Sequence, residues 1–330
     1  MIFQFTLWGA MVILSWLLSV SRQHLVPVLL ALLIYCSPSI SFGILMLILL
    51  QVLAFVQASV GTRRENNGVT QKRFAVVMAG SMLAIFGHAL GANGPGRTLG
   101  LVGLLLVIPN GVTGLFFSRF FERLTLRSYV GSVLIPAFAT LEVLARWKSE
   151  IQGEIGDVWQ VAVLLVGGVT VLVSGLMSLA RLRIRPAIVF WTQSMVGFAL
   201  ISLASSDETL MRQALASLAV ASITSVVLMS SAARMGKGHF TFSRVSTLGL
   251  PGLIGFVTLQ SVGRILFELG IPWVGLGFLG FFMQAMVFVL CEPRTPLTAL
   301  RSTMLRFWVV VAVQVATGCG MLWVMSGGLK

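Results

Sequence analysis

The sequence predicts an all-α fold, a polytopic transmembrane helical bundle of about 12 spans, within a range of about 11 to 14. Apolar residues make up 57% of the 330 residues and charged residues only 10%. The charges form short clusters between apolar stretches of roughly 20 residues, the length that crosses a bilayer core of about 30 Å. That core offers no water to backbone amides, so each crossing must be a helix. We therefore expect a single integral membrane domain over residues 1–330.

The apolar runs place the spans in order along the chain. They are 2–20, 25–36, 41–60, 74–91, 99–117, 128–145, 158–180, 187–204, 214–233, 246–266, 271–290 and 307–326. The first run has no basic residue before it and no small-residue cleavage site after it, so we expect a retained span and not a signal peptide. Pro38 separates the second run from the third, because proline interrupts a helix. Small residues four positions apart, such as Ser174 and Ser178, predict close helix contacts.

The basic residues predict the orientation, because Lys and Arg in short loops stay preferentially on the cytoplasmic side. Most of them fall in alternate breaks between the runs, and most acidic residues fall on the other side. We therefore expect a multi-pass protein of the cell inner (plasma) membrane with both termini outside, in the periplasm. This reading places Arg73 in a cytoplasmic loop. It also places every lysine in a loop or at the terminus, namely Lys72, Lys148, Lys237 and Lys330.

Charge and cysteine usage exclude several classes of protein. The formal charge of +13 is dispersed between helices and not gathered on one soluble face, so we expect lipid headgroups as partners and no nucleic acid. Cys36, Cys291 and Cys319 have neither metal-ligand nor redox spacing. The sequence contains no metal motif, nucleophile elbow or carboxylate dyad. We therefore expect no cofactor, no metal and no catalytic residue, and no enzymatic activity of the chain by itself.

Three segments carry a recognisable pattern. Segment 183–197 runs from basic residues through Phe190-Trp191 to Thr192-Gln193-Ser194 and a glycine, and segment 246–256 contains a Leu-Pro-Gly break. Segment 116–124 is rich in aromatic residues around Glu122. In order and spacing these segments resemble motifs of antiporter-like membrane subunits. Those are the proton- or cation-translocating subunits of respiratory complex I, multisubunit cation/proton antiporters and membrane-bound hydrogenases.

The resemblance implies a helix broken by proline and glycine, where free carbonyls and half-helix dipoles can bind ions or substrates. The residues of this break are Gly249, Pro251, Gly252 and Gly255. It also implies a shortened, degenerate relative, because the stretch from Glu122 to Arg183 is much shorter than in the family. The position of the family's later lysine falls at residues 258–260, which include no lysine. Since a relay needs titratable groups inside the membrane and arginine cannot hand a proton on, we expect a pump-deficient protein.

Several polar residues are candidates for a polar axis or ion path: Glu122, Arg119, His88, Arg264, Glu268 and Glu142. Arg119 and Glu122 share a helix face, or they belong to an interfacial helix whose arginines meet lipid phosphates. His88 is a titratable group inside a span, or an interfacial histidine bonded to another helix. Arg264 with Glu268, and Glu142 with Arg146, have the i,i+4 spacing of salt bridges.

These observations predict a non-enzymatic or pump-deficient membrane subunit of a proton- or cation-coupled complex, respiratory or inorganic-carbon-uptake-like, that anchors or shapes the assembly. Its partners would be other integral membrane subunits, lipids and a cytoplasmic subunit on the basic face. The alternative is a stand-alone permease for a small anionic or amphipathic solute, which would use the Pro251 break and Arg264, although no internal repeat supports it. A membrane enzyme acting on lipids is a third reading.

Overall fold

The fold is described here from a computed structural model. It describes residues 25–37, 39–61, 67–90, 94–108, 114, 117, 121–122, 124–151, 156–232, 241–243, 246–247, 254–290, 307–316 and 318–319. These residues are almost all helical, and none of them lies in a strand. Among them are seven helices long and apolar enough to cross a membrane, together with three shorter apolar helices. The predicted all-α, polytopic fold is confirmed.

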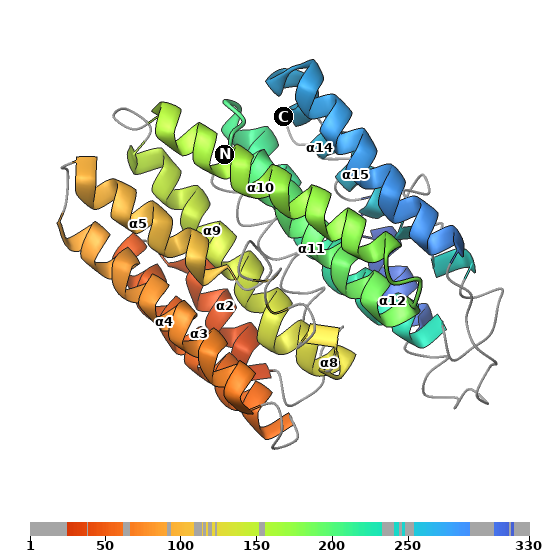
Figure 1. Cartoon of the computed structure of the whole chain (residues 1–330), viewed down its shortest axis with the longest axis horizontal. Coiled ribbons are helices and arrows are strands. Elements are labelled where there is room, and N and C mark those ends of the chain that lie inside the picture. Colours follow the sequence, from red (N-terminus) through yellow and green to blue (C-terminus); the bar gives the residue numbers. More distant parts are fainter. Residues whose placement is uncertain are drawn as a thin grey trace. The chain divides into compact units, whose positions relative to one another are not determined.

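The helices follow the predicted runs (Figure 1). In chain order they are α2 (Leu25–Cys36), α3 (Ile40–Gly61), α4 (Asn67–Ala89), α5 (Gly94–Val107), α8 (Leu126–Tyr129), the π-helical turn η3 (Val130–Leu134), α9 (Ile135–Ile151), α10 (Gly156–Leu179), α11 (Ile184–Ser202), α12 (Glu208–Ala232), α14 (Ile254–Leu269) and α15 (Ile271–Leu290). A further apolar helix lies at Phe307–Ala316. The predicted run 2–20 lies outside the described residues.

Several helix ends differ from the prediction. Helix α4 begins at Asn67, which puts Lys72 and Arg73 inside it, and α9 continues to Ile151, which includes Lys148. The prediction that every lysine lies in a loop or at the terminus is therefore wrong for Lys72 and Lys148. A long basic side chain can leave the apolar stripe for an interface or an internal acceptor, so hydropathy alone underestimates helix length. Helix α5 ends early, just before Pro109, because the residue before a proline is driven out of helical geometry.

The chain divides into two compact units. Unit 1 comprises Met1–Ser19, Gly175–Trp191 and Asp207–Lys330, and unit 2 comprises Val20–Ser174 and Thr192–Ser206. Two of the boundaries between the units fall within helices, one in α10 and one in α11. A single domain over residues 1–330 stays a prediction.

In unit 2, α4 and α5 pack through glycines. A Cβ on Gly87 would collide with the backbone of Gly100, and one on Gly80 would lie 2.8 Å from the carbonyl oxygen of Gly103. A Cβ on Gly100 would also overlap the ring of Trp147 in α9. Lipid tails are as apolar as the side chains between helices, so close backbone approach is what favours such contacts in a membrane.

Helices α10 and α11 make the same kind of contact in unit 2. A Cβ on Gly167 would lie 2.8 Å from the carbonyl oxygen of Gly197. Ser174 lies about two turns after Gly167 on α10, and Ser194 lies about one turn before Gly197 on α11. Their hydroxyls share a hydrogen bond of 2.7 Å. The predicted close helix contact at Ser174 is confirmed.

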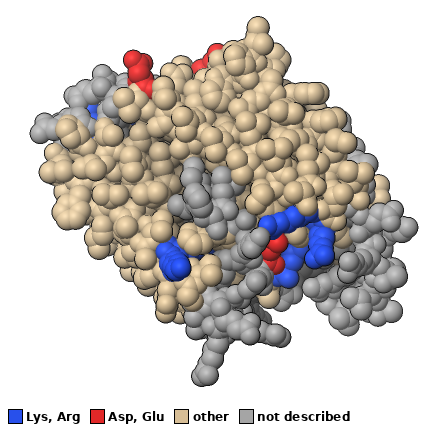
Figure 2. Space-filling view, viewed as in Figure 1, with Lys and Arg blue, Asp and Glu red and all other residues tan. Residues whose placement is uncertain are grey.

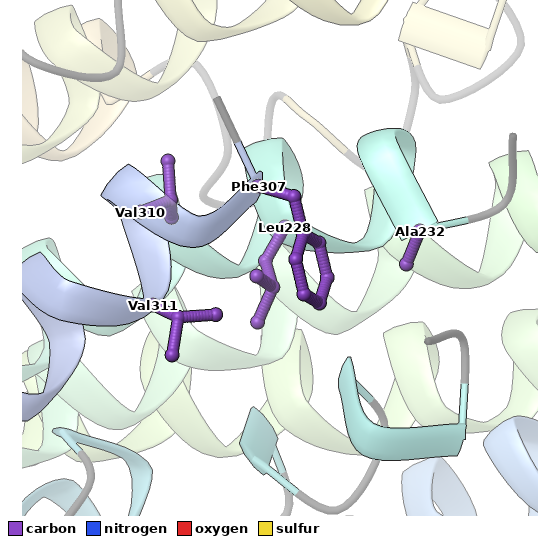
Figure 3. Close-up of a cluster of buried hydrophobic side chains, with 5 residues drawn as sticks. All are labelled: Leu228, Ala232, Phe307, Val310 and Val311. Carbon is purple, nitrogen blue, oxygen red and sulfur yellow. The ribbon is translucent and has the colours of Figure 1, made fainter. Parts of the chain in front are cut away.

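Unit 1 is built around α12, α14, α15 and helix 307–316. Figure 3 shows Leu228 and Ala232 of α12 beside Phe307, Val310 and Val311, which form a buried apolar cluster. Gly270 separates α14 from α15 with a φ of +104°, and its N–H donates to the Leu266 carbonyl at 3.1 Å. That backbone conformation is open to glycine at little cost, so the helix can end within one residue.

Candidate intramembrane polar site

The most unusual backbone in unit 2 is the π turn η3, whose residues are all buried. The Ile135 N–H donates to the Val130 carbonyl, one residue further back than in an α-helix. Pro136 has no N–H, so the Ser132 carbonyl lacks its α-helical donor. The backbone here therefore presents an acceptor to the interior of the unit.

Arg73 of α4 supplies the missing donor. Its Nη2 donates to the Ser132 carbonyl at 3.1 Å, and its guanidinium carbon lies 5.0 Å from the centre of the Phe121 ring. The side chain is only 7% exposed and belongs to a candidate span, Gly68–Ala89. Within the described part of the chain, no carboxylate forms an ion pair with it. Because a guanidinium stays protonated, Arg73 is a fixed buried positive charge.

Tyr129 joins this group to the middle of α11. Its ring lies 6.0 Å from that of Phe121, and its hydroxyl shares a 2.5 Å hydrogen bond with Thr192 Oγ1. The next residue, Gln193, is fully buried, and neither of its amide atoms has a hydrogen-bond partner among the described residues. A buried amide of this kind is ordinarily satisfied by internal water. The site thus combines one fixed cation with neutral hydroxyl and amide groups.

The last turns of α9 hold a second group of polar residues. Arg146 Nε donates to Glu142 Oε1 at 3.1 Å, so the predicted i,i+4 salt bridge is present. Its two terminal nitrogens donate to the carbonyls of Tyr35 and Ser37, at the end of α2. Carbonyls at a helix C-terminus lack intrahelical donors and carry partial negative charge, so a guanidinium satisfies both needs. A role of Glu142 in an ion path stays a prediction.

Lys148, also in α9, holds the turn that follows α11. Its Nζ donates to the Ser205 carbonyl and its side chain is buried. Trp159 Nε1 donates to the nearby Leu203 carbonyl at 3.3 Å. Lys148 is therefore a helix-end contact inside the protein and not the loop residue that the sequence predicted.

His88 bonds across two helices. Its Nε2 and the Ser41 hydroxyl of α3 are 2.7 Å apart, and the ring is half-buried in the last turn of α4. Among the described residues, the hydrogen bond of His88 goes to Ser41, and no hydrogen bond or ion pair joins His88 to Glu122 or Glu142. The geometry fits the reading of a histidine bonded to another helix.

The other predicted site residues are more scattered. Glu122 is half-buried, while its expected partner Arg119 lies outside the described residues. Arg264 and Glu268 are both exposed on α14, and their pairing stays a prediction. Of the predicted helix break, Gly249, Pro251 and Gly252 lie outside the described residues, and Gly255 is buried in the first turn of α14.

Unit 1 contains a neutral polar bridge. Ser246 donates to Gln314 Oε1 at 2.6 Å, and Gln314 Nε2 donates to Thr224 Oγ1 at 2.9 Å. All three residues are buried. Ser246 opens the segment that resembles the family's broken helix, so this segment is tied to α12 through Gln314. Gln260, at the position of the family's later lysine, has a buried amide oxygen without a partner among the described residues.

Arg73, Ser132 and Tyr129 are not among the site residues predicted from the sequence. Two signals could have found them. The pair Lys72-Arg73 adjoins an apolar run, and on a helix these neighbours point about 100° apart, so only one can face solvent. Pro136 inside the run 128–145 predicts a free carbonyl four residues earlier, at Ser132.

The chain resembles known proteins in its fold. No family model matches the chain, and no curated protein matches it. Solved structures do match. A chain of the Mrp complex from Dietzia sp. DQ12-45-1b is 12% identical, with a TM-score of 0.75 over 90% of this chain and 75% of that one.

Two structures of respiratory complex I from Thermus thermophilus also match. In the one with bound aureothin, a chain is 17% identical, with a TM-score of 0.65 over 90% of this chain and 82% of that one. In the one with bound NADH, a chain is 13% identical, with a TM-score of 0.70 over 96% of this chain and 80% of that one. At such identities the likeness shows the fold alone, and at that level the predicted resemblance to antiporter-like membrane subunits is confirmed.

Proposed function

We propose that this protein is a non-enzymatic integral membrane subunit of a proton- or cation-coupled complex, respiratory or inorganic-carbon-uptake-like, which anchors or shapes the assembly and does not itself pump. The fold shared with chains of the Mrp complex and of respiratory complex I supports membership in such an assembly. Membership is a proposal, because one fold can host several functions.

The proposal that this subunit does not itself pump is supported by the chemistry of its buried polar groups. In the described interior of unit 2, the groups around the middle of α11 are hydroxyls, an amide and the guanidinium of Arg73. Glu142 and Lys148, which can titrate, are engaged with Arg146 and the Ser205 carbonyl in the last turns of α9. A relay needs neighbouring groups that gain and lose a proton across the bilayer, so the fixed or engaged character of these described groups supports the pump-deficient proposal.

The surface of the described residues fits partners within the membrane. In Figure 2 the visible face is mostly uncharged, and Lys, Arg, Asp and Glu form small separate groups on it. On α15, Ile271 is 87% exposed and Phe278 is 73% exposed. Such apolar faces suit lipid tails or neighbouring membrane subunits. The exposed Arg183, just before α11, and Arg185, in its first turn, suit lipid headgroups or a cytoplasmic subunit.

Purification tests membership. The full chain, tagged and expressed from its own locus, is extracted in mild detergent and weighed by native mass spectrometry. We expect integral membrane partners in fixed stoichiometry, which persist when the salt concentration is raised. A chain that runs alone under these conditions contradicts membership and favours the permease.

Reconstitution tests the pump-deficient part. The assembled complex is placed in liposomes that contain a pH-sensitive dye, and its substrate-driven proton movement is compared before and after substitution of Glu142 by Gln. We expect proton movement to fall by less than about twofold once protein stability is matched, because a residue outside a relay contributes little to the rate. Loss of nearly all proton movement, with the assembly intact, would overturn this part.

A further inference from the structure

Arg73 is held as a fixed charge in the interior of unit 2. Its guanidinium donates to the Ser132 carbonyl, which lacks its α-helical donor because Pro136 has no N–H, and it lies over the Phe121 ring. No carboxylate among the described residues neutralises it through an ion pair. The adjacent Lys72 is exposed, so two neighbouring cations of α4 have opposite environments.

Polar groups that could admit water are linked to Arg73 through the rings of Phe121 and Tyr129. The Tyr129 ring is tilted against the same Phe121 ring, its hydroxyl bonds Thr192, and the amide of Gln193 follows next on α11. Water recruited by buried hydroxyls and amides conducts protons even where no side chain titrates. A subunit with such an interior must therefore keep the membrane closed to protons by other means.

We propose that Arg73 is the electrostatic barrier that keeps protons and other cations from crossing unit 2. This inference rests on the proposed function, since only a subunit that does not pump needs a permanent block. Fixed positive charge in a polar constriction excludes protons and cations in membrane channels. At about 5 Å and an effective dielectric constant of about 20, one such charge lowers the local cation occupancy on the order of a hundredfold.

The purified full chain in liposomes of neutral and anionic phospholipid tests the barrier. A potassium gradient with valinomycin sets the membrane potential, and an internal dye reports proton entry. We expect the wild type to stay at the background of empty vesicles. Arg73→Met should raise proton entry about tenfold or more, because the barrier is electrostatic. Lys72→Met is the matched control on the same helix and should stay at background.

Arg73→Lys separates charge from packing, because lysine and methionine have similar lengths and differ in charge. The barrier requires Arg73→Lys to stay near background while Arg73→Met leaks. Equal leaks in both variants would assign Arg73 a packing role and overturn the proposal, as would a tight Arg73→Met variant with a wild-type elution profile.

A second pair keeps the test informative where Arg73→Met does not fold. Phe121→Glu places a carboxylate beside the intact guanidinium and cancels its field, whereas Phe121→Gln changes the shape without the charge. We expect proton entry to rise in the first and not in the second, and equal entry in both would overturn the barrier. Membership in a complex is measured separately by purification, so a failed barrier leaves the proposed function standing.

Discussion

Arg146 shows how one side chain in a membrane protein can satisfy several otherwise unmatched groups. It neutralises Glu142 and donates to the two carbonyls at the end of α2. The spacing of Glu142 and Arg146 on one helix predicts their salt bridge, and that bridge is present. The carbonyls of Tyr35 and Ser37 lie 111 and 109 positions away in the sequence, so no local pattern identifies them.

Replacing Arg146 by Met should lower the free energy of unfolding by about 2–3 kcal/mol, because it leaves a buried carboxylate and two carbonyls without their donor. Chemical unfolding in detergent measures this loss. The control is Glu208→Gln in the pair Glu208–Arg212, whose atoms are 3.5 Å apart and whose carboxylate side chain is 50% exposed, against 10% for Glu142. An exposed pair contributes less than about 1 kcal/mol, so equal losses would contradict the assigned contacts.

The hydroxyl pair Tyr129–Thr192 makes a second residue-scale prediction. Tyr129→Phe leaves the buried Thr192 hydroxyl without this partner, and we expect a loss of about 1 kcal/mol in unfolding free energy. The double variant Tyr129→Phe with Thr192→Val removes both polar groups, so it should be more stable than the sum of the two single losses. Strict additivity in this double-mutant cycle would show that the two hydroxyls do not interact.

At the scale of elements, apolar length predicts where helices lie but not which of them are central. The span Val130–Lys148 is 94% buried and Ile184–Ser202 is 89% buried, whereas Ile40–Gln57 is 39% buried. Of these three spans, Ile40–Gln57 has the highest mean hydropathy and also the largest exposed share. Lipid is an apolar solvent, so a lipid-facing helix is apolar all round, and the buried helices are those that can carry polar groups.

Glycine contacts between α4 and α5 make an element-scale prediction. Gly87→Ala would push its Cβ into the backbone of Gly100 and should lower the midpoint of thermal unfolding in detergent by several degrees. Gly68→Ala on the same helix has nothing within 4 Å of the new Cβ and should keep or raise the midpoint, because alanine favours a helix. Equal effects of the two substitutions would contradict this packing.

For the whole molecule, the two units and their helices make a multi-pass membrane protein, and the orientation stays a prediction from the basic residues. The turn between α10 and α11 contains Arg183 and the turn between α11 and α12 contains Asp207, and both residues are exposed. One helix joins these turns, so they should lie on opposite sides of the membrane.

Cysteine labelling measures this orientation. In a chain whose native cysteines are replaced by serine, Asp207→Cys should react with an impermeant maleimide in intact cells. Arg183→Cys should react only after the membrane is permeabilised, because basic loops stay in the cytoplasm. The reverse pattern would invert the topology and place the termini inside.

The local sequence predicts the helical class, the position of nearly every described span and the resemblance that the fold comparison confirmed. It could do so because a bilayer of fixed thickness requires a fixed length of apolar helix, and that length is written locally in the chain. It also predicted the salt bridge of Glu142, since i,i+4 neighbours lie on one helix face.

The contacts of the buried polar side chains become visible only in the folded chain. Arg73 falls in a predicted loop, yet it bonds a carbonyl 59 positions away that lacks its α-helical donor because of a proline. Lys148 also falls in a predicted loop, yet it bonds the Ser205 carbonyl 57 positions away. The physical reason is that a buried cation needs an acceptor, and in both cases the acceptor is a backbone carbonyl, which every residue carries and no sequence motif marks.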